Sequence, residues 1–162
     1  MIHKSLTSNI VEVGSVSARV AYLVIRITDR YRLKVIQVYA PTSTYPDDEV
    51  DAIYEDIAKA MPRTNTYYTV VMGDFNAKLG VQEYGESRVG VFGYGCRNHR
   101  EQMLVNFLES QGLFLMNYFF QKKPQRKWTW QSPDGVTKNE IDFIMSNKQQ
   151  PHLQGCFCDH RG

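Results

Sequence analysis

The sequence places an acid and an amide directly after an apolar run, at the predicted end of a β-strand. Tyr67–Met72 is apolar and rich in strand-forming residues, and Gly73-Asp74-Phe75-Asn76 follows it. In open α/β sheets, ligands gather at the carboxyl ends of strands. Asp74 and Asn76 are therefore well placed to address an attacking water and a phosphoryl oxygen. The alternative is an Asx-type turn, in which both side chains bond only to nearby backbone groups.

A second acidic residue lies in an unfavourable setting. Asp142 is part of the apolar segment Ile141–Ile144, where a carboxylate is costly unless it is paired. Asp159 and His160 follow near the end of the chain. A buried Asp142 bonded to a ring nitrogen of His160 would fix the imidazole tautomer and favour its charged form. The alternatives are an outward-facing Asp142 and a surface His160.

Two further features are compatible with phosphate binding. Tyr39 ends a predicted strand just before Ala40-Pro41-Thr42, where its phenol can donate to a phosphate oxygen or simply pack. A short segment before Trp128 and Trp130 holds four cations in six residues: Lys122, Lys123, Arg126 and Lys127. Such a segment either contributes sequence-independent affinity for DNA or is an ordinary solvated loop.

The elements that must position these residues alternate between strands and helices. Strands are expected at 9–13, 18–27, 31–39, 67–72, 113–119, 127–131 and 140–145. Amphipathic helices are expected from Pro46 to Met61 and from Arg100 to Ser110, the second capped by Gly112. This order predicts a mixed sheet with helices on its outer faces, and the first long strands are expected to be buried on both sides.

Composition excludes several classes of protein. A chain of 162 residues predicts one domain, covering residues 1–162. Hydrophobic residues at 43% and charged residues at 22% exclude a disordered or collagen-like chain, and a net charge of +2 excludes a histone-like one. No apolar run approaches the ~20 residues of a membrane span, and no signal-type segment opens the chain.

The three cysteines are an odd number, and two of them form a C-x-C, so no disulfide framework is expected. A zinc site at Cys156, Cys158 and His160 lacks a second cysteine pair. An intracellular protein is therefore predicted.

Five segments, taken together, resemble a known family in their order and spacing. They are Val38–Thr42, Gly73–Asn76, Trp128–Gly135, Ile141–Ile144 and Asp159-His160. From about Val16 to His160 the chain is similar to the endonuclease/exonuclease/phosphatase family, and most of all to the endonuclease domains of RTE-clade non-LTR retrotransposons. The resemblance implies an α/β fold: a deoxyribonuclease I-like two-sheet sandwich with mixed sheets and outer helices. It also implies Mg²⁺-dependent nicking of DNA by in-line attack of water, in the nucleus.

The resemblance assigns roles to individual residues. Asp74 would activate or orient the attacking water, and Asn76 would hold that water or the scissile phosphate. Asp142 would pair with His160, whose imidazolium would neutralise the phosphate. Asp159 would be a ligand of Mg²⁺, or of Mn²⁺ as an alternative metal.

Other residues would hold the DNA. The resemblance implies that Tyr39, Thr129 and Thr42 position phosphate oxygens, and the basic segment that ends at Lys127 would contact the DNA backbone. The glycine-spaced loop 80–95 can supply adaptable backbone contacts. A reverse transcriptase would follow downstream in a longer parent protein.

The sequence also departs from the family pattern. In the family, a motif with an Asn and a motif with the metal-binding Glu lie upstream of the position of Tyr39. In this sequence, Glu12 is the sole acidic residue before Asp29, and the residues around it match neither motif. The N-terminal part and the strand after His160 are therefore expected to be missing, which would leave sheet edges exposed to self-association. A decayed or exapted copy that binds nucleic acid or protein without hydrolysis is the first alternative function. A phosphatase that acts on a soluble phosphoester is the second.

Overall fold

The computed structural model describes residues 3–61, 66–93, 97 and 99–149. The strands are β1 (Ile10–Ser17), β2 (Val20–Arg26), β3 (Arg32–Tyr39), β4 (Tyr68–Asp74), β5 (Phe114–Leu115), β6 (Trp130–Gln131), β7 (Lys138–Asn139) and β8 (Asp142–Ser146). The helices are α1 (Asp47–Ala60), α2 (His99–Gln111) and the short 3-10 helices η1 (Lys4–Asn9), η2 (Met116–Tyr118) and η3 (Pro124–Arg126).

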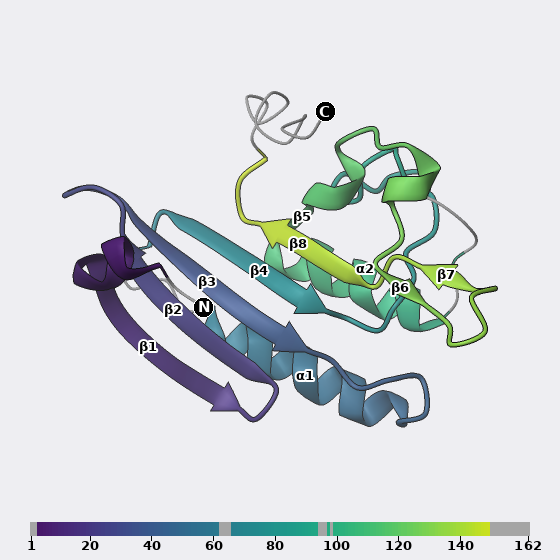
Figure 1. The fold of residues 1–162 in the computed structure, drawn as a ribbon, viewed down its shortest axis with the longest axis horizontal. Coiled ribbons are helices and arrows are strands. Elements are labelled where there is room, and N and C mark those ends of the chain that lie inside the picture. The colour runs from purple at the N-terminus through teal and green to yellow at the C-terminus, as the bar shows by residue number, and fades with distance from the viewer. Residues whose placement is uncertain (1–2, 62–65, 94–96, 98, 150–162) are drawn as a thin grey trace.

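Six of the strands form one mixed sheet in the order β1-β2-β3-β4-β8-β5 (Figure 1). β3 and β4 are parallel, and every other neighbouring pair is antiparallel. β6 and β7 form a separate two-stranded ribbon, near the end of the sheet where β3 and β4 finish. The mixed α/β class predicted from the sequence is confirmed.

Both long helices lie on the same face of the six-stranded sheet, behind it in Figure 1. On this covered face, Ile36 of β3, Val71 of β4 and Met145 of β8 are fully buried. They belong to one core cluster with Ile57 of α1 and Leu104 of α2. The two helices therefore close one side of the sheet over a single hydrophobic core.

The opposite face, here called the open face, is covered less completely. Alternate residues of the central strands point to it, and Val35, Val70 and Met72 are only partly buried. Ile144 of β8 is 39% exposed. The prediction that the first strands are buried on both faces is therefore wrong for the described residues, because both helices share one face. The second sheet of the structure is the two-stranded ribbon of β6 and β7.

The helices form where the sequence predicts them. α1 begins after Pro46, with three acidic residues in its first turn, where negative charge is favourable to the helix dipole. Its buried side includes Val50, Ile53 and Ile57, at the predicted helical spacing. α2 is followed by Gly112 with φ +66°, the left-handed conformation in which glycine commonly ends a helix.

Three predicted elements differ from the structure. β4 runs on through Asp74, so this residue ends a strand rather than lying in a turn. The strand expected at 113–119 is reduced to β5, because η2 follows directly. The strand expected at 127–131 is reduced to β6, which pairs with β7 in the separate ribbon, whereas β8 joins the large sheet.

No helix in the described part of the chain is long and apolar enough to cross a membrane.

Candidate active site

Three of the predicted site residues meet in one row across the large sheet. Tyr39 is the cross-strand neighbour of Asp74 in the parallel pair β3–β4. Asp74 is in turn the neighbour of Asp142 in the antiparallel pair β4–β8. Adjacent strands are about 4.8 Å apart, so the three Cα positions span roughly 10 Å. We call Tyr39, Asp74 and Asp142 the carboxylate row; it lies where β3 and β4 end and β8 begins (Figure 1).

All three side chains of the row belong to the open face. Tyr39 is 56% exposed, Asp74 is partly buried and Asp142 is exposed. Asp142 was expected inside an apolar strand, but it is the first residue of β8, and the buried Phe143 that follows it points to the covered face. The expected burial of Asp142 is therefore wrong, and the outward-facing alternative is correct for its position in the strand.

The pKa of Asp74 depends on its burial and on two neighbours, Asn76 and Asp142. Burial raises the pKa of the Asp74 carboxyl above its ordinary value, and the nearby charge of Asp142 raises it further. A hydrogen bond from the Asn76 backbone lowers this pKa in part. In the described residues, no Lys, Arg or His forms an ion pair with either carboxylate. Two like charges therefore face solvent side by side.

Asn76 holds the segment just after Asp74. Its φ of 48° is left-handed, a conformation that asparagine adopts more readily than most residues. Its backbone N–H donates to Asp74 Oδ1 at 2.9 Å, and its side-chain Nδ2 donates to the Ala40 carbonyl at 2.9 Å. The Asx-type turn considered from the sequence is thus present. It uses one oxygen of Asp74 and one amide hydrogen of Asn76, so the other Asp74 oxygen and Asn76 Oδ1 are available for a substrate.

The backbone below the row is tightly packed. Gly73 has φ +142°, and a Cβ built there would lie 1.9 Å from the Val38 carbonyl oxygen. Only glycine fits this close approach of β3 and β4. Beyond the strand ends, the Ala40 N–H donates to the Asp74 carbonyl and the Phe75 N–H donates to the Ile141 carbonyl, both at 2.8 Å. The backbone positions of the row are therefore well fixed.

Thr129, predicted to hold a phosphate oxygen, lies next to the start of β8. Its Oγ1 accepts hydrogen bonds from the backbone N–H groups of Ile141 and Asp142, at 3.1 and 3.2 Å. Both acceptor sites of the hydroxyl are occupied, whereas its own hydrogen can still be donated. The structure thus brings Thr129 to the carboxylate row and leaves it able to donate to a phosphate.

Asn117 is a positioning residue that the sequence did not suggest. Its Nδ2 donates to the Asp142 carbonyl at 3.1 Å and to Glu140 Oε1 at 2.9 Å, and its Oδ1 accepts from the Ile144 N–H at 2.8 Å. Burial raises the pKa of Glu140, and the hydrogen bond from Asn117 opposes this rise. A lone asparagine after an apolar run carries no pattern from which this role could be predicted.

Arg19 is a second residue that sequence reasoning missed. Its carbonyl accepts a hydrogen bond from the Tyr39 N–H at 3.0 Å. Its guanidinium lies 5.7 Å from the ring centre of Tyr39 and 5.3 Å from that of Tyr45, within the range of cation–π attraction. A cation thus lies at the Tyr39 end of the row. It is brought there by the β1–β2 turn, whereas the sequence placed it inside the strand expected at 18–27.

Thr42 is not placed on the row. Its hydroxyl pairs with that of Thr44 at 2.9 Å in the loop after β3, and its carbonyl accepts from Arg100 at 3.0 Å. Arg100 also contacts Asp47 at 2.9 Å, which ties the start of α2 to the start of α1. The structure therefore gives Thr42 a loop-stabilising contact.

The basic segment lies next to the β6–β7 ribbon. Lys122, Lys123 and Arg126 are exposed. Lys127 instead donates through Nζ to the Phe92 carbonyl at 2.6 Å. Trp128, just before the ribbon, and Trp130 of β6 are 37% and 41% exposed, and Lys138 Nζ of β7 lies 4.7 Å from the Trp128 ring centre. Three of the four predicted DNA-contacting cations are thus free to meet a phosphate, and the fourth also secures a loop.

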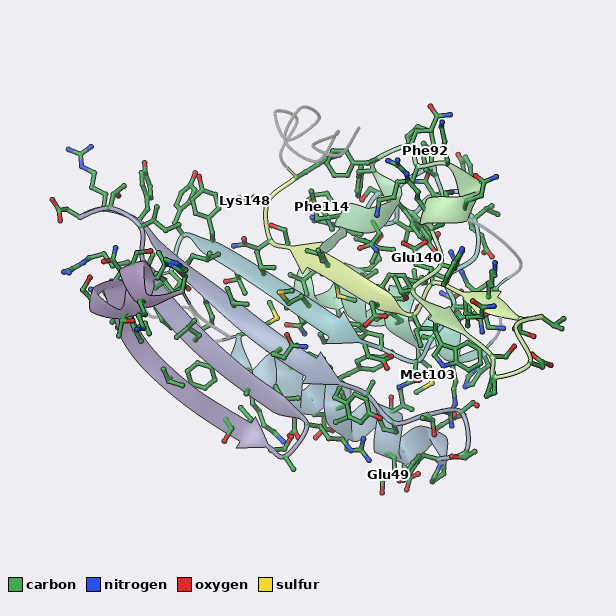
Figure 2. All side chains as sticks on the ribbon, viewed as in Figure 1. Glu49, Phe92, Met103, Phe114, Glu140 and Lys148 are labelled. Carbon is green, nitrogen blue, oxygen red and sulfur yellow. The ribbon has the colours of Figure 1, made fainter. Side chains whose placement is uncertain are left out.

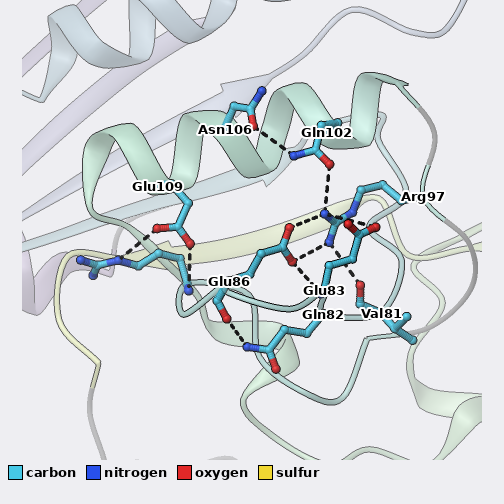
Figure 3. Close-up of polar contacts among 9 residues, drawn as sticks. Val81, Gln82, Glu83, Glu86, Arg97, Gln102, Asn106 and Glu109 are labelled. Atoms are coloured by element: carbon cyan, nitrogen blue, oxygen red, sulfur yellow. Dashed lines mark hydrogen bonds and ion pairs between the residues drawn. The ribbon is translucent and has the colours of Figure 1, made fainter.

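The glycine-spaced loop is less adaptable than the sequence suggested. Arg97 forms a bidentate contact with Glu86 and also bonds to Gln102 of α2 at 3.1 Å and to the Val81 carbonyl at 3.2 Å (Figure 3). The side chains of Arg97 and Glu86 are only 6% and 13% exposed. The contact with Arg97 lowers the pKa of Glu86. This network fixes the loop to α2.

The remaining predicted residues, Asp159 and His160, lie outside the described residues, as do Cys156 and Cys158. Among the residues that the structure does describe, no group of three or more His, Cys, Asp or Glu side chains is arranged to hold a metal ion. The carboxylate row offers two carboxylates, which are oxygen ligands of the type that Mg²⁺ prefers. Mg²⁺ is commonly held by one or two carboxylates together with substrate phosphates. The described residues therefore fit Mg²⁺ as a partial site.

Comparison with known proteins identifies relatives of the chain. The model of the endonuclease–reverse transcriptase family matches residues 33–161. Craniofacial development protein 2 from Bos taurus is 36% identical over 122 residues, which are 74% of this chain and 20% of that protein. The corresponding protein from Tragulus javanicus is 35% identical over 122 residues, 74% of this chain and 21% of its own length. The chain thus spans about a fifth of the length of these curated relatives.

One solved structure supports the fold. Truncated TDP2 from Caenorhabditis elegans superposes with a TM-score of 0.50 at 10% identity, over 85% of this chain and 52% of its own. An endonuclease/exonuclease/phosphatase family protein from Leptotrichia buccalis C-1013-b has a TM-score of 0.46 at 19% identity, over 80% of this chain and 42% of that one.

Proposed function

The chain belongs to the endonuclease–reverse transcriptase family, and from this premise we propose that its carboxylate row is the active site of a Mg²⁺-dependent DNA endonuclease of retrotransposon type. The observation that carries the proposal is the register of three strands, which sets Tyr39, Asp74 and Asp142 side by side on the open face. Such a site would hydrolyse one phosphodiester and leave a nick in one strand.

Asp74 is the proposed general base. Burial and the charge of Asp142 raise the pKa of Asp74, which makes its carboxylate a better proton acceptor than an ordinary aspartate. In the proposed step, a water held between Asp74 and Asn76 attacks the phosphorus, and its proton passes to Asp74. The bond to the leaving 3′ oxygen breaks on the opposite side, and that oxygen takes up a proton.

Tyr39, Thr129 and Arg19 are proposed to hold the phosphate. The phenol of Tyr39 and the hydroxyl of Thr129 each have a hydrogen to donate, and Arg19 is a cation at the Tyr39 end of the row. Mg²⁺ or Mn²⁺ would be held by oxygens of the row together with Asp159, and when bound it supplies charge that stabilises the phosphate transition state. The pairing of Asp142 with His160 is part of the same proposal.

The DNA itself is proposed to run past the β6–β7 ribbon. The exposed cations Lys122, Lys123 and Arg126 would contact backbone phosphates and give an affinity that falls as salt increases. The proposal places the activity in the nucleus, where genomic DNA is found. A reverse transcriptase domain in a longer parent protein would then extend the nicked end.

A second candidate function is a binding module with the same fold but without hydrolysis. It is favoured by one observation: the described residues bring together only the two carboxylates of the row, with no third acidic or histidine ligand beside them. In that case DNA would still bind to the basic segment, but Mg²⁺ would have little effect at the row.

Nicking of supercoiled plasmid separates the two functions. We expect the 162-residue chain to convert supercoiled plasmid to open circles with Mg²⁺ and not with EDTA. The variants Asp74→Asn and His160→Ala should each lower the rate by at least about 100-fold, in keeping with the usual contribution of general acid–base groups. The matched control is Asp134→Asn, which changes an exposed aspartate in the turn between β6 and β7.

Two results would contradict the proposed endonuclease. One is a folded wild-type chain that binds DNA without nicking it, which would support the binding module. The other is nicking that Asp74→Asn and Asp134→Asn leave equally strong, which would place the activity elsewhere or in a contaminant.

A further inference from the structure

Three tyrosines lie close together on the open face, at the end of the sheet farthest from the carboxylate row. Tyr31 precedes β3, and Tyr67 and Tyr68 lie at the start of β4. The ring centres of Tyr31 and Tyr67 are 4.9 Å apart, and those of Tyr67 and Tyr68 are 4.7 Å apart, both edge-to-face. Tyr31 is 41% exposed and Tyr67 is 47% exposed. We call these residues the tyrosine cluster.

A lysine contacts this cluster, and an arginine lies beside it in the chain. Lys148, just beyond β8, places its Nζ 4.7 Å from the ring centre of Tyr67. Arg30 precedes Tyr31 in the turn that also holds Asp29, whereas Arg32 alternates with the buried Lys34 along β3 and so belongs to the covered face. Within the described residues, none of these four charged side chains forms an ion pair. The cluster therefore combines exposed aromatic rings with uncompensated cations.

The tyrosine cluster and the carboxylate row share one face of the sheet. Tyr68, Val70, Met72 and Asp74 alternate along β4, so their side chains point the same way. Asp74 follows Tyr68 by six positions along β4, which corresponds to a distance of about 20 Å. In Figure 2 the labelled Glu140 and Lys148 lie just beyond opposite ends of β8, Glu140 before the strand and Lys148 after it. A nucleic-acid strand of about six nucleotides covers this length.

We propose that the tyrosine cluster is a stacking platform for unpaired bases of the DNA on which the carboxylate row acts. The inference rests on the proposed function, because it names single-stranded DNA as a second ligand of the same open face. Aromatic rings stack on any unpaired base, whereas the bases of a duplex already stack on one another. Lys148, which contacts Tyr67, and Arg30 would neutralise the accompanying phosphates.

Fluorescence anisotropy in EDTA tests the platform without any need for hydrolysis. The probes are a 5′-fluorescein-labelled dT15 oligonucleotide and a 15-base-pair duplex. We expect Tyr31→Leu with Tyr67→Leu to weaken dT15 binding about tenfold and to change duplex binding less than twofold. Leucine retains apolar cover for the end of the sheet, so a purely structural role would be preserved. Phenylalanine at both positions should bind dT15 as the wild type does.

Two further variants sharpen the test. Tyr84→Leu changes a fully exposed tyrosine in another loop and should leave both affinities unchanged. Lys148→Gln should lower affinity modestly and reduce the slope of log Kd against log salt by about one. Circular dichroism of each variant confirms that it is folded before its affinity is compared.

The outcomes distinguish this inference from the proposed nuclease. The platform is overturned if the double leucine variant binds dT15 as tightly as wild type, or if the wild type does not bind dT15. Either result leaves Mg²⁺-dependent plasmid nicking intact if the row is catalytic. Conversely, tyrosine-dependent binding of dT15 by a chain that never nicks plasmid would support the platform and overturn the endonuclease.

Discussion

The carboxylate row at the end of β4 and the Glu86–Arg97 pair beside α2 place acidic side chains in opposite surroundings. Glu86 contacts a buried arginine, and this contact lowers its pKa. Asp74 instead faces Asp142, and both burial and that neighbouring charge raise its pKa. A carboxylate that is already neutralised supports the fold, whereas two adjacent carboxylates without a cation leave binding capacity for a metal or a proton.

The largest expected effect concerns the buried pair. Glu86→Gln should lower the free energy of unfolding by about 3 kcal/mol, because it removes the carboxylate that contacts the buried Arg97 guanidinium through both oxygens. Urea denaturation followed by circular dichroism measures the change. Glu83→Gln is the matched control: Glu83 lies 3.8 Å from the same arginine but is 61% exposed, so its loss should cost less than about 0.5 kcal/mol. Equal losses of unfolding free energy in the two variants would show that burial of the Glu86–Arg97 pair does not determine its contribution to stability.

The next effect concerns metal binding at the row. Mg²⁺ at ten times its dissociation constant should stabilise the wild-type chain by about 1.4 kcal/mol. Asp74→Asn and Asp142→Asn should each remove most of this gain, whereas Glu83→Gln should keep it. Thermal unfolding with and without Mg²⁺ provides the measurement. Stabilisation that survives in both aspartate variants would mean that the metal binds away from the row.

The two sites should also respond to pH with opposite sign. Asp74 has a folded-state pKa above the ordinary 3.8, so the wild type loses stability as pH rises from that value through the raised pKa. Asp74→Asn should therefore stabilise the protein at neutral pH, by less than about 1 kcal/mol because the group is partly solvated, and the gain should vanish near pH 3.

Glu86 behaves in the reverse way. Its folded-state pKa lies below the ordinary 4.5, so its contribution is complete above that value and is lost as pH falls through the lowered pKa. The cost of Glu86→Gln should accordingly shrink in acid. Urea titrations of the three proteins between pH 3 and pH 7 compare both trends. Parallel pH profiles for the two variants would contradict the proposed difference between the sites.

The smallest expected effect is the influence of the Asp142 charge on the pKa of Asp74. Asp142→Asn should lower the pKa of Asp74, because it removes the like charge, but should leave it above the ordinary value because burial is the larger cause. Titration of the side-chain carboxyl carbon by nuclear magnetic resonance reports this shift. An unchanged pKa would show that the two carboxylates do not interact.

Much of the architecture could be predicted from local patterns. Runs of β-branched residues predicted β2, β3 and β4 to within a few residues, and acidic residues after Pro46 predicted the start of α1. These patterns depend on neighbours in the chain, so sequence alone contains them. The strand expected at 113–119 failed, because an apolar run does not reveal that η2 replaces all but the first two strand residues.

The candidate site was predictable in its residue types but not in all of its members. Asp74, Asn76, Tyr39 and Thr129 were named from motifs, and the structure brings them together. Arg19 and Asn117 were not, because each acts through contacts with residues far away in the sequence and neither belongs to a recognisable motif. Asp142 was also named from a motif and lies beside Asp74, but its exposure depends on which face of β8 the helices cover.

The sequence by itself determined which segments form strands and helices and which side chains could handle a phosphate, because backbone preference and side-chain chemistry are local properties. Only the tertiary structure decided that β3, β4 and β8 are neighbours in one register, so that Tyr39, Asp74 and Asp142 form a row. It also decided that α1 and α2 share one face of the sheet and leave the row exposed on the other. Strand order and layer choice arise from burying the apolar surface of the whole chain at once, and no short segment contains that information.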